Sequence, residues 1–141
     1  MITGINIYET QAYKSKLDPD KNNATIFHIG MLDPFLRAHI DDEVTSFEVS
    51  SKNPNDKAKA SICASKRNLL AVRFGLKGID GFLDPRTKEP VKYDAVSVSI
   101  GGKNYNGVSE TLLAMLGKAL IDELAEAILK ENAISEDERK N

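Results

Sequence analysis

Few side chains in this sequence have the type and spacing that metal binding or catalysis needs. His28 lies in a segment of β-branched and aromatic residues, and His39 follows close to the acidic pair Asp41 and Asp42. Imidazole and carboxylate groups are zinc ligands, but this spacing fits none of the established ligand patterns. We therefore predict no metal site.

Two further features have a structural interpretation that is simpler than a chemical one. Cys63 has Arg67 four residues later, and a nearby cation can lower a thiol pKa, but a cysteine in an alanine-rich helix face is usually a small core residue. The Gly101-Gly102-Lys103 segment lacks the strand and helix context of a phosphate-binding loop. We predict no cofactor and no enzymatic activity.

The composition is that of an ordinary folded protein. The chain has 141 residues, of which 28% are charged and 41% hydrophobic. We predict a single domain over 1–141, with an N-terminal arm and loop (1–23), an α+β core (24–108) and a helical C-terminus with a polar tail (109–141). The single cysteine fits a reducing cytoplasm. We see no signal peptide and no apolar run of about 20 residues, the length that a membrane span needs.

Charge is distributed unevenly along the chain. Residues 57–92 contain nine basic and three acidic residues, and residues 118–141 contain four basic and seven acidic residues. The basic segment raises the alternative of a small nucleic-acid-binding regulator. Because tryptophan is absent and the aromatic residues do not alternate with the basic ones, we do not expect nucleic-acid binding.

The start of the chain predicts an arm, a loop and a strand. Ile5–Tyr8 suggests a short strand or an extended arm, and the polar stretch Glu9–Asn23 suggests a surface loop. Ala24–Gly30 is rich in β-branched and aromatic residues and predicts a strand.

A helix is predicted next. Asp33 is a natural N-cap, Pro34 suits the first helical position, and the helix is expected to run to about Asp42. Residues 44–49 either extend this helix or form a strand, and we interpret them as a strand. Residues 51–56 are predicted to form a loop.

A second helix is predicted over Lys57–Lys77, with Gly78 as its C-cap. Asp84–Pro90 predicts a polar turn, and Val91–Tyr93 alternates as a half-buried strand would. The runs Ala95–Ile100 and Lys103–Val108 flank two glycines and predict a hairpin, with a single strand and an ordered loop as the alternative.

Ser109 is expected to cap a long last helix with a broad apolar stripe. Gly117 interrupts the stripe, so we expect either a kink or a very close packing contact there. Ser135 and Glu138 match a capping box, which would begin another helix shortly before the last residue of the sequence.

Three segments resemble the tail assembly chaperones of long-tailed bacteriophages, small proteins encoded before the tape measure protein. They are IGMLDPFLRAHIDDEVTSFEV, NLLAVRFGLKGIDGFLDPRTKEPVKYD and VSETLLAMLGKALIDELAEAILKENAISEDERKN. The resemblance covers most of the chain from about Thr25 onward. It implies a non-catalytic protein of the bacterial host cytoplasm, absent from the mature virion, that keeps the tape measure protein soluble and helps recruit tail tube subunits. It also implies a longer product made by ribosomal frameshifting.

A chaperone of this kind needs exposed apolar side chains at helical spacing. Our candidates for partner binding are Phe74, Ile79, Phe82, Leu112, Leu116, Leu120, Leu124 and Ile128. The alternative is that these side chains pack on each other as core. Self-association is also compatible with the sequence. The alternative function is a structural virion component, such as a head–tail connector or a tail terminator. We expect a small, mostly antiparallel sheet with helices packed on it.

Overall fold

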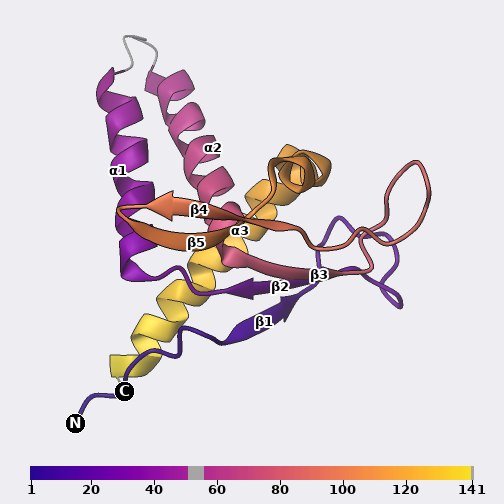
Figure 1. Ribbon diagram of the computed structural model, residues 1–141, viewed down its shortest axis with the longest axis horizontal. Helices are drawn as coiled ribbons and strands as arrows, with labels where there is room; N and C mark the ends of the chain where they lie inside the picture. The colour runs from indigo at the N-terminus through magenta and orange to yellow at the C-terminus, as the bar shows by residue number, and fades with distance from the viewer. Residues whose placement is uncertain (51–55, 141) are drawn as a thin grey trace.

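Groups of short antiparallel strands and groups of helices follow one another along the chain in the computed structural model, which describes residues 1–50 and 56–140. The elements are β1 (Thr10–Tyr13), β2 (Ile26–Gly30), α1 (Pro34–Ser50), α2 (Asp56–Gly75), β3 (Leu76–Asp80), β4 (Ala95–Ile100), β5 (Lys103–Val108) and α3 (Glu110–Lys140). In Figure 1, α1 and α2 stand side by side and α3 runs diagonally across the molecule. The predicted α+β class with a helical C-terminus is confirmed.

The strands form two separate antiparallel sheets. One sheet has the order β1-β2-β3, and the other is the β4–β5 hairpin. The hairpin was predicted from its sequence, and its turn has Gly101 and Gly102 at φ angles of 59° and 80°, as a two-residue type I′ turn requires.

The N-terminal segment differs from the prediction. No strand forms at Ile5–Tyr8, and β1 lies instead within the polar stretch that we expected to be a loop. β1 pairs with β2, with Tyr13 opposite Phe27. Its first three residues are exposed, so this edge strand lacks the apolar alternation that would have revealed it.

Helix α1 begins as predicted and ends later. The Leu36 N–H donates to Asp33 Oδ1 at 2.8 Å, so Asp33 is the N-cap. The prediction of a strand over residues 44–49 is wrong, because α1 continues to Ser50. No glycine or proline interrupts this segment, and Val44 continues the four-residue spacing of Leu36 and Ile40. Apart from Asp56, the predicted loop at 51–56 lies outside the described residues.

Helix α2 ends at Gly75, and a strand follows with no intervening loop. The prediction that the helix runs to Lys77 with Gly78 as its cap is wrong, because Leu76–Asp80 pairs with β2. The Lys77 ammonium group instead donates to the Phe74 carbonyl at 2.7 Å and satisfies one of the last carbonyls of the helix. Pairing with β2 thus overrides the helical pattern.

The segment between β3 and β4 is a turn and an irregular stretch. The predicted polar turn is confirmed, since the Asp84 N–H donates to the Glu89 carbonyl at 2.9 Å and the Lys88 N–H to the Asp84 carbonyl at 2.9 Å. The strand predicted at Val91–Tyr93 is wrong: these residues have no ladder partner. Tyr93 donates its hydroxyl hydrogen to the Leu76 carbonyl at 2.7 Å.

Helix α3 is kinked and runs to Lys140. Ser109 caps it as predicted, with the Leu112 N–H donating to Ser109 Oγ at 3.3 Å. Gly117 has φ 78° and ψ 163°, so the predicted break is a kink. The prediction of a new helix at Ser135 is wrong, because α3 passes through this position.

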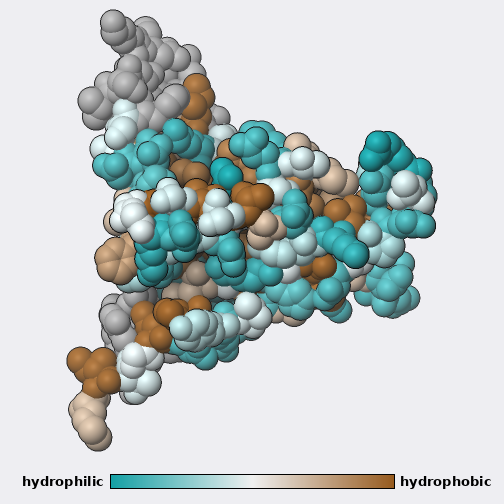
Figure 2. All heavy atoms as spheres, in the orientation of Figure 1, coloured by the Kyte–Doolittle hydropathy of each residue, from teal (hydrophilic) through white to brown (hydrophobic). Residues whose placement is uncertain are grey.

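The core lies where the helices meet β2, β3 and β5. Its largest fully buried side chains are Phe27, Ile40, Val72, Leu76, Val108, Leu124 and Ile128. Gly75 lets α2 approach α3 closely, since a Cβ at this position would lie 2.7 Å from Ile128 Cγ2. On the face shown in Figure 2, the apolar surface is divided into small patches separated by hydrophilic residues.

Candidate partner-binding groove

Most of the side chains predicted to bind a partner lie in the interior. Phe74, Ile79, Leu112, Leu116, Leu124 and Ile128 are buried in the core. The expectation that they are exposed is wrong, because α3 turns its apolar face toward α2 and the strands, and Phe74 on α2 and Ile79 on β3 belong to the same core. Their role in partner binding stays a prediction, and in this conformation a partner would contact another surface.

The structure brings the other two predicted residues, Phe82 and Leu120, together. Both are half-buried and line a hollow of about 640 Å³ beside the loop that follows β1. Phe82 packs on Phe27 with the ring centroids 6.3 Å apart. Glu123 holds the loop in place, since its carboxylate accepts hydrogen bonds from the Ser15 hydroxyl and the Lys16 N–H.

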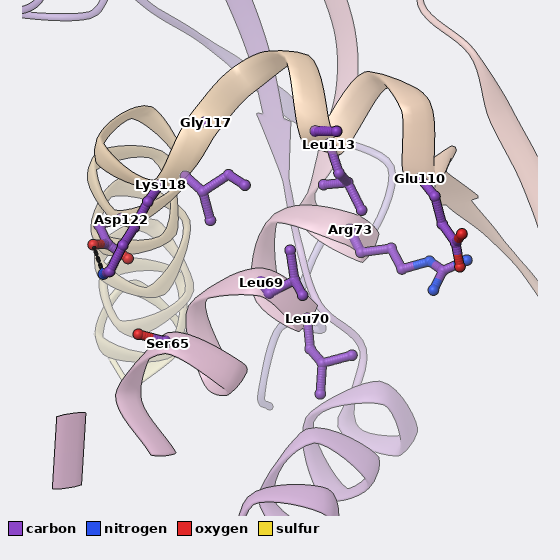
Figure 3. Close-up of a pocket in the computed structure, with 11 residues that line it drawn as sticks. Ser65, Leu69, Leu70, Arg73, Glu110, Leu113, Gly117, Lys118 and Asp122 are labelled. Atoms are coloured by element: carbon purple, nitrogen blue, oxygen red, sulfur yellow. Dashed lines mark hydrogen bonds and ion pairs between the residues drawn. The ribbon is translucent and has the colours of Figure 1, made fainter. Parts of the chain in front are cut away.

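A second hollow, the α2–α3 groove, is lined mainly by aliphatic side chains. It has a volume of about 550 Å³, and its apolar lining comes from Leu69, Leu70, Leu113, Ala114 and Ile121. In Figure 3, Leu69 rises from α2 toward Leu113 on the first part of α3, whereas Leu70 extends from α2 in the opposite direction. Leu69 is 42% exposed, whereas Leu113 and Ile121 are only 6% and 8% exposed. The groove therefore has a buried floor and an accessible rim.

The kink at Gly117 creates the concave shape of this groove. Its backbone conformation is one that glycine almost alone adopts. No atom lies within 4 Å of the place where a Cβ would stand, so the conformation rather than a lack of space requires glycine here. The first turns of α3 consequently point in a different direction from the rest of the helix, and α2 closes the angle (Figure 3).

A polar contact fixes one end of the groove. Asp122 accepts hydrogen bonds from Asn68 Nδ2 on α2 at 3.0 Å and from Lys118 Nζ at 2.7 Å. These two hydrogen bonds lower the pKa of Asp122 below its ordinary value, and the hydrogen bond from Lys118 has the larger effect. Asp122 is therefore ionised at neutral pH and ties the two walls together.

Arg73 lies at the other end of the groove. Its Nε is buried and makes no hydrogen bond within the described part of the chain. The arginine side chain packs against Gly107, where a Cβ would lie 3.2 Å from Nε. In Figure 3 the guanidinium group extends toward Glu110 at the start of α3. This end of the groove thus presents both signs of charge.

The candidate metal ligands are not brought together. His28 Nε2 lies 2.7 Å from Asp80 Oδ2, across from β2 to β3, and His39 is on α1. Among the described residues, no group of three or more His, Cys, Asp or Glu side chains could hold a metal ion. In the same part of the chain, no helix has the length and apolar character needed to cross a bilayer.

Comparison with known proteins places this chain in no family. It matches no protein-family model, no curated protein and no solved structure. What can be said of the groove therefore follows from its own residues, which form an accessible aliphatic surface with charged side chains at both ends.

Sequence reasoning did not group the groove residues into a site. Leu113 and Ile121 stand beside the apolar stripe of the last helix, and Leu69 and Leu70 belong to the second helix. The signal was Gly117, because its non-helical conformation changes the direction of the helix. Apolar side chains on both sides of the kink face the interior, and the groove is lined by residues from both parts of α3.

Proposed function

We propose that this protein is a tail assembly chaperone of a long-tailed bacteriophage. It binds the tape measure protein in the host cytoplasm, helps recruit tail tube subunits, is absent from the mature virion and performs no catalysis. The observation that carries the proposal is the α2–α3 groove, an apolar surface that the core leaves open. The resemblance of three sequence segments to this chaperone family supports it.

The groove suits one face of an amphipathic helix. Such helices insert apolar side chains at spacings of three and four residues into a hydrophobic groove. The floor at Leu113 and Ile121 offers contacts for these side chains, and Leu69 at the rim would become covered. Covering aliphatic surface is the main favourable term in such binding.

Charges at the rim would set the orientation of the bound segment. Lys118 and Asp122 stand at one end, and Arg73 and Glu110 stand at the other (Figure 3). Rim charges contribute more to specificity and association rate than to affinity. We therefore expect the partner helix to have charged residues flanking its apolar face.

Co-expression with the adjacent tape measure gene product tests the proposal. We expect the protein to raise the soluble fraction of the tape measure protein and to co-purify with it. Leu69→Asp should abolish both effects, because it places a carboxylate in the apolar groove. Ile134→Asp is the matched control, since Ile134 is similarly exposed, at 38%, and lines neither of the two hollows. No gain in solubility with the unaltered chain would contradict the proposal.

Mass spectrometry of purified virions separates this function from that of a structural component. A chaperone that leaves during assembly should be absent from the particles. A connector or tail terminator would be present in stoichiometric amounts, and that result would overturn the proposed function.

A further inference from the structure

The β4–β5 hairpin has a free edge along β4. β5 pairs with β4 and packs against α2, whereas β4 has no strand on its other side in the described part of the chain. In Figure 1, β4 is the upper strand of the hairpin, and no strand follows it on that side. An uncovered edge strand presents unpaired backbone N–H and C=O groups to any strand that can align with it.

The register identifies the backbone groups that are free. In a two-residue hairpin the residues flanking the turn, Ile100 and Lys103, form a hydrogen-bonded pair. Hydrogen-bonded and non-hydrogen-bonded pairs alternate along an antiparallel ladder. Val98 and Val96 therefore direct their backbone groups toward β5. The backbone groups of Ala95, Ser97 and Ser99 point away from the hairpin, along its open edge.

This edge lacks the devices with which proteins usually prevent edge-to-edge pairing. The sequence AVSVSI contains no charged residue and no proline, and β4 pairs with β5 over its full length without a bulge. β-Branched residues occupy half of its positions, which favours further strand pairing.

We propose that β4 pairs antiparallel with β4 of a second copy of this chain, with the twofold axis at Ser97. The two sheets then join into one continuous sheet with β4 and its symmetry mate at the centre. Ser97 forms a hydrogen-bonded pair with Ser97 of the partner subunit, and Ala95 pairs with Ser99 of the partner subunit. This register uses every outward-facing backbone group of the strand, and a twofold axis at Val96 or Val98 uses fewer.

The side chains on both faces fit this self-pairing. The strand reads nearly the same in both directions from Ser97, with valines on either side and the small residues Ala95 and Ser99 beyond them. Val96, which is 41% exposed in the single chain, would pack beside Val98 of the partner subunit. On the other face only alanine and serine would meet. The near-symmetry of the strand favours a second copy over an unrelated strand.

No charge opposes the twofold arrangement. The strand itself is neutral, and the nearest flanking acidic residue, Asp94, would face Ile100 of the partner subunit. The Asp94 residues of the two copies would be roughly 20 Å apart along the strands. Neutral surface thus meets neutral surface when the same patch of the two subunits comes together, as it does in an isologous interface.

Disulfide cross-linking tests the register. In a Cys63→Ala background, Ser97→Cys places two thiols at the twofold axis, where paired Cα atoms are about 5.5 Å apart and can be bridged. Ser99→Cys in the same background is the matched control, because its two copies would be about 14 Å apart. We expect mild oxidation to give a covalent dimer with Ser97→Cys and none with Ser99→Cys. Equal cross-linking of the two variants, or none with either, would overturn the proposal.

Sedimentation equilibrium of the full chain tests the association itself. We expect a reversible monomer–dimer equilibrium that Ser97→Pro weakens by about tenfold or more, because two backbone hydrogen bonds lose their donors. Ser97→Thr should retain the dimer, and circular dichroism should show that both variants are folded. A monomer at all concentrations would overturn the proposal. If the chain is a monomer and Ser97→Pro weakens binding of the tape measure protein, the edge of β4 pairs with a strand of that protein and not with a second copy.

Discussion

At the scale of single residues, Asn132 joins two parts of the chain that are distant in sequence. It is buried on α3, its Oδ1 accepts a hydrogen bond from the Leu32 N–H at 3.0 Å, and its Nδ2 donates to the Ile128 carbonyl at 2.7 Å. The Asn132 side chain thereby provides an acceptor for the Leu32 N–H, which lies between β2 and α1 and has no partner in a helix or a sheet of the described chain.

Asn132→Ala should lower the free energy of unfolding by about 1–3 kcal/mol, because the buried Leu32 N–H loses its acceptor. Chemical denaturation followed by circular dichroism measures this change. Lys130→Ala on the same helix is the matched control and should change stability by about 0.5 kcal/mol or less, as exposed substitutions usually do. Equal effects of the two substitutions would show that the amide does not fix this junction.

Asp122 makes the stability of the folded chain depend on pH. Its pKa is lowered in the folded chain, so its contribution to stability is present above the unfolded pKa of about 3.9 and is lost as the pH falls through the folded pKa. We expect Asp122→Asn to be less stable than the unaltered chain at pH 7, and the difference should shrink toward pH 3. Thermal denaturation at both pH values measures it, and a difference that grows on acidification would contradict this sign.

Local contacts at this scale were predictable, and distant ones were not. Asp33 and Ser109 cap helices that begin within a few residues of them, so residue type and position were sufficient. Asn68 and Asp122 are 54 residues apart, and Leu32 and Asn132 are 100 residues apart. No local pattern marks such pairs, since only the fold brings them together.

At the scale of elements, Gly117 decides the path of α3 and the shape of the groove. Gly117→Ala should destabilise the protein by about 1–3 kcal/mol, because a side chain is strained in this conformation. If α3 straightens to relieve the strain, the concave surface is lost and binding of the tape measure protein should weaken as well.

Gly4→Ala controls for the substitution itself, since Gly4 lies in open surroundings with no positive φ. Thermal denaturation and co-purification with the tape measure protein measure the two effects. A fully stable, fully binding Gly117→Ala variant would contradict the role given to the kink.

Elements with strong local signals were predicted correctly, and those that depend on pairing were not. β2, the β4–β5 hairpin and the start of α3 carry apolar alternation, a Gly-Gly turn and a cap. β1 is exposed and polar, and β3 reads as the end of a helix. Both form strands because their backbones pair with β2. The strand propensity of each segment on its own does not reveal this pairing.

At the scale of the whole molecule, the fold class could be predicted, and the location of the open apolar groove could not. Apolar periodicity identified which side chains are segregated from water, but not whether a partner or the protein's own core covers them. For Leu124 and Ile128, which are fully buried, the answer is the core. The open apolar surface is the α2–α3 groove, which lies where Gly117 bends α3 beside α2.

Site-specific photo-cross-linking tests the central claim, that the α2–α3 groove binds the tape measure protein. A photo-reactive residue in place of Leu69 should form an adduct with the co-expressed tape measure protein. The same residue in place of Ile134, which is similarly exposed at 38% but lines neither hollow, should not. Adducts from position 134 alone, equal adducts from both positions, or adducts from neither would contradict the account.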